Sequence, residues 1–407
     1  MLNSLTNILF VIVFIFSATI SSGQENREKE RKIASIKFSV VGDLMCHSPQ
    51  FIFAQTDSGY DFSSNFKYIK KFFHDADFTI GNFETVLAGG KRGYSGYPRF
   101  NAPDEYLDAV KDAGFDLLTT SNNHALDKGK SGVLRTIDKI KEAGLYGVGT
   151  YKSQAERDSL RIINVNGISF VLLSYSYGTN GMPIPKGEDY LINLIDEELI
   201  KKDIQKAKNS GVDLIMVYFH FGNEYQTKPS SYQQDIVKKT IGYGADIILG
   251  GHPHVVEPIE TFKTNGGNLD SGFVSYSLGN FISNQRWRYS DGGPILNFTV
   301  NKNLDKDSLY VNQLEIIPAW VFRGKIDSVD TYTIIPSDSV SLHYRYSFLT
   351  SEDEKNMKQS YNDIVNIMSS SYKGIQFYSP SVLLNNFKCY PRGFDFLPAE
   401  LPKTSIK

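Results

Sequence analysis

The sequence predicts an α/β layered domain, and two patterns indicate this fold class. Short apolar runs rich in β-branched residues, typical of buried strands, alternate along the chain with stretches that have the spacing of amphipathic helices. Five of these apolar runs lead directly into Asp, Asn, Glu or His side chains. In sheets of this class ligands bind where the carboxyl ends of strands converge. We therefore expect the five strand ends to meet at one site.

The predicted strands before residue 281 each end at polar residues, and they are 36–41, 78–80, 115–119, 214–219 and 247–249. Helical spacing is found between them, at 66–73, 105–113, 132–143, 197–208 and 232–242. Beyond residue 281 we expect strands at 292–300, 308–317 and 339–348, with turns at 301–307 and 335–338. A capped helix is predicted at 351–368, with its start at the acidic run 351–354.

Two histidines, His252 and His254, follow the strand at 247–249 in one tight turn. Neutral imidazole is the commonest protein ligand of zinc, manganese and iron. Asn and Asp occur in turns for backbone reasons, but histidine does not. Four of the seven histidines in the chain lie at predicted strand ends: His124, His220, His252 and His254. This distribution predicts convergence on a metal rather than ordinary loop chemistry.

Six motifs occur in a fixed order between residues 36 and 281: VGDLM at 41–45, GNFET at 81–85, SNNHALDKG at 121–129, HFGNEY at 220–225, GHPHV at 251–255 and SLGNF at 277–281. As an ordered set they resemble the bacterial capsule synthesis protein CapA family of poly-gamma-glutamate biosynthesis. That family is similar to the calcineurin-like metallophosphoesterases. The resemblance implies a four-layer sandwich, in which two β-sheets are flanked by helices and a two-metal centre lies at the strand ends. Periodicity alone indicates only α/β.

The resemblance also implies the ligands of the metal centre, which are Asp43, Glu84, Asn123, His220, His252 and His254. Glu84 stands where the phosphoesterase pattern usually has a bridging aspartate. His124 matches the catalytic histidine, which acts near a substrate oxygen as proton donor or electrostatic stabiliser. Carboxylate, amide and imidazole ligands suit divalent manganese, zinc or iron. One or two such ions are expected, and a pair can clamp a transferring group and activate a water.

The chain departs from the phosphoesterase pattern at Met45, where the usual Asp-x-His motif has its histidine. A thioether is a poor ligand beside hard oxygen donors, so one expected ligand is missing. His47, four residues after Asp43, either takes its place or is a loop histidine with local hydrogen bonds. The departure leaves open whether the chain is an enzyme.

Further residues near the motifs have candidate roles. Asp127 either completes a catalytic pair by orienting the ring of His124 or caps the helix that follows it. Glu224 either contacts substrate or metal-bound water, or is a solvated loop acid. Arg99 is a candidate substrate contact because guanidinium fits carboxylates and phosphates, although such an arginine is more often simply exposed. Asn280 is expected to hold the His-Pro-His turn by hydrogen bonds.

Composition sets limits on partners and on the number of domains. A chain of 407 residues can bury one large core, with or without a smaller appendage. The net charge of −2 and the pI near 6.4 do not favour nucleic acid or an anionic membrane surface, so a polyanion would have to bind locally. We expect a domain at 36–285 and a C-terminal extension at 286–407, made of strands and a helix and packed on the core.

The first 23 residues resemble a secretory signal peptide, with an apolar run at 8–16 followed by small residues up to Gly23. The run is shorter than the roughly 20 residues of a spanning helix, which favours cleavage near Gly23 over an uncleaved membrane anchor. No lysine or arginine precedes it. Residues 24–35 then form a charged linker. An extracytoplasmic location, periplasmic, secreted or at the cell envelope, is expected.

The sequence supports two hypotheses for function. The first is a metal-dependent, phosphoesterase-like hydrolase of capsule biosynthesis, which acts on a phosphate ester or on an amide of a polyglutamate-like polymer. The second is a non-catalytic subunit that binds capsule polymer and helps to export or attach it. In both, the expected partner is an anionic polymer or a phosphate-containing substrate, together with other capsule synthesis proteins.

Overall fold

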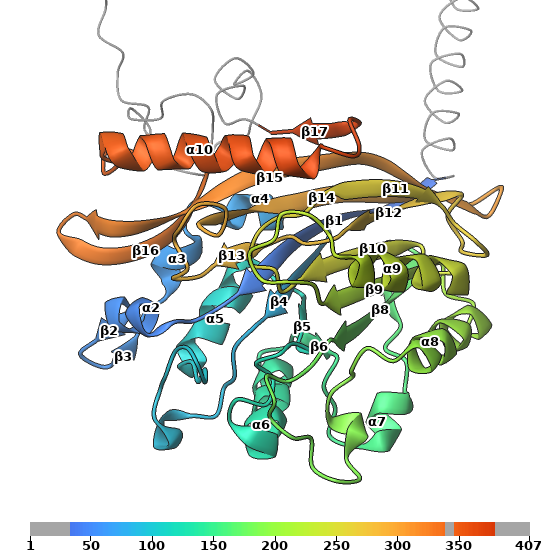
Figure 1. The fold of residues 1–407 in the computed structure, drawn as a ribbon, viewed down its shortest axis with the longest axis horizontal. Coiled ribbons are helices and arrows are strands. Elements are labelled where there is room, and N and C mark those ends of the chain that lie inside the picture. The colour runs from blue at the N-terminus through green and yellow to red at the C-terminus, as the bar shows by residue number, and fades with distance from the viewer. Residues whose placement is uncertain (1–32, 338–345, 379–407) are drawn as a thin grey trace, which may run out of the picture.

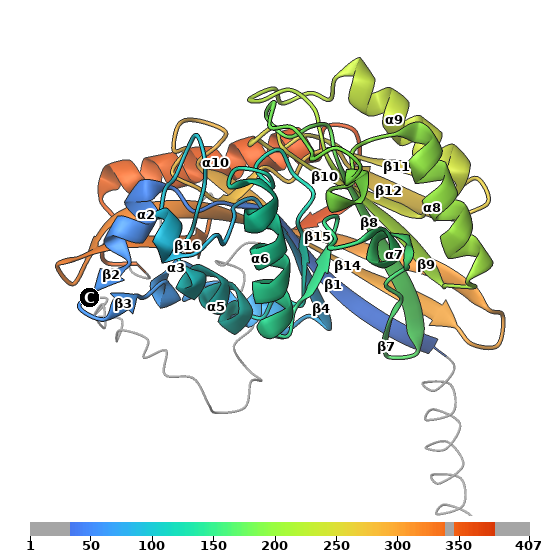
Figure 2. The same cartoon turned by 90° about the horizontal axis from the view of Figure 1, so that it is seen from below.

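The computed structural model describes residues 33–337 and 346–378 (Figure 1). Two β-sheets pack face to face. The larger sheet has the strand order β16-β15-β14-β1-β4-β5-β6, with β13 beside β1 and β17 beside β15. The smaller sheet has the order β11-β12-β10-β9-β8-β7. Helices cover both outer faces (Figure 2). The predicted α/β architecture of two sheets flanked by helices is confirmed.

The strands of the larger sheet are β1 (Ile33–Leu44), β4 (Phe78–Phe83), β5 (Leu117–Thr119), β6 (Tyr146–Val148), β13 (Asn280–Ile282), β14 (Gly292–Asn303), β15 (Ser308–Ile326), β16 (Val329–Pro336) and β17 (Ile375–Phe377). Those of the smaller sheet are β7 (Ile163–Val165), β8 (Ile168–Ser176), β9 (Leu214–His220), β10 (Ile247–Gly251), β11 (Ile259–Lys263) and β12 (Ser271–Ser275). A separate ribbon joins β2 (Gln55–Thr56) to β3 (Gly59–Tyr60).

The helices are α2 (Ser48–Phe53), α3 (Ser63–Phe66), α4 (Lys70–His74), α5 (Asp104–Ala113), α6 (Gly129–Glu142), α7 (Gln154–Asp158), α8 (Glu197–Asn209), α9 (Ser231–Tyr243) and α10 (Ser351–Met368), with 3₁₀ turns η1 (Gly90–Arg92) and η2 (Asp189–Leu191). Side chains of α3, α4 and α5 share one apolar cluster with the larger sheet, and those of α8 and α9 share another with the smaller sheet. Among the described residues, no helix has both the length and the apolar character needed to cross a membrane.

A cluster of aromatic rings holds the two sheets together. Phe38 on β1 is fully buried, and its ring centroid lies 5.2 Å from that of Phe170 on the opposite sheet. Phe78 and Phe298 flank Phe38 within its own sheet, at 6.2 Å and 5.1 Å. Phe273 of the smaller sheet lies against Phe298 in an edge-to-face contact at 5.1 Å. Such rings bury large apolar areas and gain further from edge-to-face geometry.

The five strands predicted before residue 281 are all present, as β1, β4, β5, β9 and β10. Four of the helices predicted there are present as α5, α6, α8 and α9. The predicted continuous helix at 66–73 is wrong, because residues 67–69 separate α3 from α4. Phe66, Ile69 and Phe72 are all buried, so the apolar spacing reflects core contacts made from α3, from the turn after it and from α4 rather than from one long helix.

The C-terminal segment differs from its prediction in the length of β15 and in a further strand that includes residues 335 and 336, which were expected in a turn. β15 continues well past residue 317 and turns back at Asp327 and Ser328, whose positive φ values of 50° and 68° fit a two-residue hairpin turn. The returning strand is β16, where no strand was expected. Most of the strand predicted at 339–348 lies outside the described residues, and its last three residues, 346–348, are not in a strand. The helix predicted at 351–368 is α10, capped by Thr350, whose hydroxyl accepts from the backbone N–H of Asp353.

The described part of residues 286–407 continues the larger sheet, because β14 pairs antiparallel with β1 from Ile33 to Val40. β1 itself begins at Ile33, inside the stretch predicted as a linker. The predicted signal peptide and the rest of the linker lie outside the described residues. Parallel pairing of β1 with β4, and of β9 with β10, brings four carboxyl ends to the same side of the sandwich. The candidate site lies there.

Candidate metal centre

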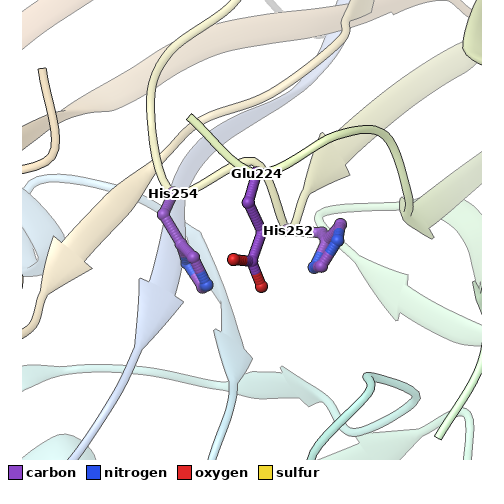
Figure 3. A group of neighbouring side chains, drawn as sticks. All are labelled: Glu224, His252 and His254. Atoms are coloured by element: carbon purple, nitrogen blue, oxygen red, sulfur yellow. The ribbon is translucent and has the colours of Figure 1, made fainter. Parts of the chain in front are cut away.

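Two groups of possible metal ligands lie at these strand ends. Asp43 at the end of β1, Glu84 after β4 and His220 at the end of β9 form the first group, and all three are fully buried. Within each group one ligand atom per residue lies within 4.8 Å of the others. Glu224, His252 and His254 form the second group, and Figure 3 shows the Glu224 carboxylate between the two imidazole rings. Glu224 is exposed, so this group lies at the open side of the site.

The two groups are continuous with each other. His254 Nδ1 lies 3.2 Å from Asp43 Oδ2, and the ring centroids of His252 and His220 are 4.9 Å apart. The remaining predicted ligand, Asn123, places its Oδ1 2.9 Å from His220 Nε2. The structure thus brings together all six side chains that the resemblance implies as ligands.

The local backbone allows this crowding only with small or strained residues. A Cβ on Gly42 would lie 1.9 Å from the carbonyl oxygen of Gly279, and one on Gly251 would lie 2.8 Å from Asp43 Oδ1. His252 and His254 have φ values of 96° and 60°, a region that non-glycine residues rarely adopt. Strained backbone of this kind collects at functional sites, where surrounding contacts hold it.

The surroundings of the Glu84 carboxylate show whether this group of residues suits a cation. Neither carboxylate oxygen of Glu84 has a hydrogen-bond partner among the residues that the structure describes, although His220 Nε2 lies 3.6 Å away. Burial, and then the neighbouring Asp43 carboxylate, raise the pKa of Glu84 well above its usual value. A buried carboxylate without donors is costly unless a charge compensates it. A divalent cation held by Glu84, Asp43 and His220 would supply that compensation, so the donor set fits a metal.

Two of the candidate ligand histidines, His220 and His252, are in the form that binds metals. Burial, and then the other histidines, lower the pKa of His220 well below its usual value and that of His252 to about 3. Both rings are therefore neutral at physiological pH. Neutral imidazole is the form that offers a lone pair to a cation.

Two asparagines support the ligands. Asn82 donates from Nδ2 to Asp43 Oδ1 at 2.8 Å and lies 3.2 Å from His220 Nδ1, so it joins two ligands of the first group. The sequence analysis gave Asn82 no role, although it lies inside the motif at 81–85. Asn280 Oδ1 lies 3.1 Å from His254 Nδ1, and its Nδ2 donates to Gln285 Oε1 at 2.9 Å. Asn280 therefore holds the His-Pro-His turn, as the sequence predicted.

His124 forms a pair with Asp127 beside the ligands. The Nδ1 of His124 lies 2.8 Å from Asp127 Oδ2, which also accepts from the backbone N–H of Phe100 at 2.6 Å. Helix α6 begins at Gly129 with Lys128 at its N-cap and no side-chain capping bond. Of the two alternatives for Asp127, the contact with the His124 ring is present and the helix cap is not.

Met45, His47 and Arg99 belong to neither ligand group. Met45 is buried in the core. His47 Nδ1 accepts from the backbone N–H of Asn284 at 3.3 Å, and burial lowers the pKa of His47 to about 4. This bond joins His47 to a segment 237 residues further along the chain, so it is not a bond within its own loop, and His47 does not replace the missing ligand here. Arg99 is exposed, but the next residue, Phe100, has its ring centroid 4.6 Å from that of His124.

Aromatic side chains border the candidate site. The ring centroid of Tyr225 lies 6.0 Å from that of His254, and Trp287 contacts Tyr225 at 5.4 Å. Tyr97 lies 6.5 Å from His124. Trp287 is 52% exposed and Tyr97 72% exposed, so flat apolar surface is available to a ligand at the edge of the site. Tyr225 lies inside the motif at 220–225, whereas Tyr97 and Trp287 lie outside the six motifs and reach the site from separate segments.

Glu257, three residues after His254, is a second buried carboxyl. Its Oε2 accepts from Gln233 Nε2 at 2.6 Å, and Oε1 has no partner within the described part of the chain. Burial raises the pKa of Glu257 from 4.5 to about 8. The folded state therefore holds this proton more tightly than the unfolded state does.

We expect Glu257→Gln to change the pH dependence of stability. The contribution of a carboxyl with a raised pKa is fully present below about pH 4.5 and is lost as the pH rises through about 8. The amide keeps an acceptor for Gln233 and does not ionise. Denaturant unfolding should show equal free energies for wild type and variant at pH 4.5, and a gain for the variant on the order of 3 kcal/mol at pH 8. Parallel pH profiles of the two proteins would refute a raised pKa at this site.

The fold and the site define an α/β sandwich protein with a candidate centre for divalent metal. Residues 37–285 match the family described as bacterial capsule synthesis protein PGA_cap. The chain belongs to this family. It is 30% identical over 284 residues to a capsule biosynthesis protein CapA of Bacillus anthracis, a match that covers 68% of this chain and 66%, just under two thirds, of that relative. It is 29% identical over 335 residues to a PGA biosynthesis protein CapA of Bacillus subtilis (strain 168), covering 81% of this chain and 84% of that one.

Solved structures of similar fold include phosphoesterases. A novel phosphatase of Mycoplasma pneumoniae is 17% identical, with a TM-score of 0.43 and coverage of 70% of this chain and 94% of that chain. A calcineurin-like phosphoesterase from Bacillus subtilis is 16% identical, with a TM-score of 0.34 and coverage of 82% and 99%. These matches concern the fold alone.

Proposed function

We propose that this chain is an extracytoplasmic, metal-dependent hydrolase of capsule biosynthesis, acting on a phosphate ester or an amide of an anionic polymer. Membership of the capsule synthesis family supports a role in capsule biosynthesis. The observation that carries the chemistry is the buried, donor-free carboxylate of Glu84 beside Asp43 and His220. The apolar run at 8–16 supports export.

If the chain is exported and cleaved, the mature protein from its host should begin near Gln24, which N-terminal sequencing would show.

The metal would be held by the six converging side chains, which are Asp43, Glu84, Asn123, His220, His252 and His254. A bound divalent cation supplies Lewis acidity and lowers the pKa of water. Next to it, Asp127 accepts the Nδ1 proton of His124, which fixes the ring and directs Nε2 away from Asp127. His124 Nε2 is therefore the atom that exchanges a proton with a substrate oxygen.

Unpaired cations favour an anionic substrate. Arg92, Arg99 and Lys128 have no carboxylate oxygen within 4.0 Å among the residues described, and Lys128 Nζ donates to Ser95 Oγ at 2.9 Å. Burial lowers the pKa of Lys128, and the positive charges of Arg92 and Arg99 lower it further, so the three cations share one region. This region adjoins His124 through Asp127. Arg99 would bind a carboxylate or phosphate of the substrate, and Glu224 would contact substrate or metal-bound water at the open side.

The test is turnover of a phosphodiester and of polyglutamate by the full chain loaded with manganese, zinc or iron. Asp43→Ala should lower turnover about 10³-fold, because a metal contributes several kcal/mol to the transition state. Asp330→Ala, at an exposed aspartate paired with Lys325, is the matched control and should have no effect. Arg99→Gln should raise KM for the anionic polymer and leave kcat unchanged. If the metal site is fully occupied and no ester or amide is turned over, the proposal that this chain is a hydrolase is excluded.

One observation favours the second function, a non-catalytic subunit that binds capsule polymer for export or attachment. Met45 stands where a histidine ligand is expected, and His47 does not join either ligand group. Measuring polymer affinity for wild type and for His252→Ala shows whether the polymer binds at the metal site or elsewhere. Unchanged polymer affinity in the variant would mean that the metal site is not where the polymer binds.

A further inference from the structure

A short segment after β8, residues 177–180, contacts four of the predicted site residues, although the sequence analysis did not select it. The ring centroid of Tyr177 lies 4.4 Å from that of His252 and 6.4 Å from that of His220. Asn180 contacts the other two, Asn123 and His124. The segment therefore bridges the candidate metal ligands and the candidate proton donor.

Asn180 determines which end of the Asn123 amide faces the metal centre. The amide of an asparagine presents an acceptor oxygen on one side and a donor nitrogen on the other, and the two can exchange by rotation. Asn123 Nδ2 donates to Asn180 Oδ1 at 3.2 Å, and Asn123 Oδ1 then lies 2.9 Å from His220 Nε2. Only the oxygen is a metal ligand. The acceptor on Asn180 thus selects the orientation that ligation needs.

Two further contacts fix Asn180 itself. Tyr177 donates its hydroxyl to Asn180 Oδ1 at 3.3 Å, so this oxygen accepts twice. With the oxygen occupied, Nδ2 points to the other side and lies 3.5 Å from His124 Nε2. His124 Nδ1 is already engaged by Asp127, so the nitrogen that Asn180 approaches is the one left for substrate.

The backbone at Asn180 has a left-handed conformation, which asparagine adopts more readily than most other residues. Its φ is 51°, in the left-handed region where glycine is the easiest residue, and Gly181 follows with φ 73°. Asn180 is exposed, so core packing does not account for its side chain. An asparagine in this conformation, with both amide atoms directed at site residues, fits a role through those contacts.

We propose that Asn180 is a positioning residue of the metal centre, which holds the Asn123 amide with its oxygen toward the metal and so raises metal affinity. The inference rests on the proposed metal site. Partners that orient ligands from outside the coordination sphere typically contribute about 10- to 100-fold in metal affinity. Removal of the Asn180 side chain should therefore weaken metal binding without unfolding the chain.

The experiment measures Mn²⁺ and Zn²⁺ affinity of the full chain by competition with a chelator, with circular dichroism as the check on folding. Asn180→Ala and Asn180→Gly should each lose about 10- to 100-fold in affinity. Glycine also relieves the strained backbone, so a loss in this variant comes from the side chain. Asn180→Asp keeps the acceptor for Asn123 and Tyr177 and should stay within about threefold of wild type. The matched control is Asn166→Gly, at an asparagine with φ 52° in the turn between β7 and β8.

The outcomes separate this inference from the proposed function. If wild type binds no metal, the metal site itself is refuted. If wild type binds metal and Asn180→Gly binds it equally well, only the role of Asn180 is refuted. An equal loss in Asn166→Gly, or a loss in Asn180→Asp as large as in Asn180→Ala, would also refute it, because the acceptor atom would then not be the cause.

Discussion

Glu84→Gln is expected to have opposite effects on the metal-free and the metal-loaded protein. Without metal, Glu84 must either stay charged beside Asp43 with no donor in the described residues or take up a proton on folding, because its pKa is raised; the amide does neither, so the chain should gain about 1–2 kcal/mol. With metal, it removes a charged ligand, and we expect a loss of affinity of at least about 100-fold, or about 2.7 kcal/mol. Thermal unfolding in chelator and in Mn²⁺ measures both effects.

The control for this prediction is Glu257→Gln, which changes a buried carboxyl outside both ligand groups. It should leave the stabilisation by Mn²⁺ at the wild-type value. If Glu84→Gln destabilises the metal-free chain, the carboxylate has a structural role that a cation does not explain. If Mn²⁺ stabilises the variant as much as wild type, Glu84 is not a ligand.

Phe38→Ala should cause the largest loss of stability in the fold. The ring is fully buried between the two sheets and contacts three other phenylalanines. Removing a buried phenylalanine leaves a cavity that the surrounding strands cannot close, at a cost of about 3–5 kcal/mol. Denaturant unfolding of the full chain measures the cost.

Two comparisons make the result for Phe38 specific. Phe38→Leu keeps much of the volume and should cost clearly less than the alanine variant. Tyr310→Ala, at a side chain 44% exposed on β15, should stay within about 0.5 kcal/mol of wild type. A loss below about 1 kcal/mol for Phe38→Ala would contradict the assignment of this ring to the main core.

The strand ends could be predicted from the sequence because each is a local pattern. An apolar run followed by a ligand-type residue marks β1, β4, β9 and β10, and the structure places their polar residues together. Helix α10 could be predicted because its amphipathic spacing and acidic first turn are local as well. The break between α3 and α4 could not, since Phe66, Ile69 and Phe72 have helical spacing and are all buried although Ile69 lies in the turn between the two helices.

Two supporting residues of the site, Asn82 and Asn180, could not be predicted, because distant contacts determine their roles. Asn180 contacts Asn123 across 57 residues of sequence, and Asn82 reaches His220 across 138. Both alternatives for Asp127 are close in sequence, at His124 three residues before it and at the helix after it, so spacing alone does not choose between them. Periodicity carries no information on such contacts.

The most direct test of the metal centre is anomalous X-ray scattering from crystals of the full chain grown with Mn²⁺ and measured on both sides of the manganese absorption edge. The account predicts a peak bounded by Asp43, Glu84 and His220, at coordination distances of about 2.0–2.3 Å from their ligand atoms. A well-ordered site with no peak among these side chains, or with manganese bound only elsewhere, would contradict it.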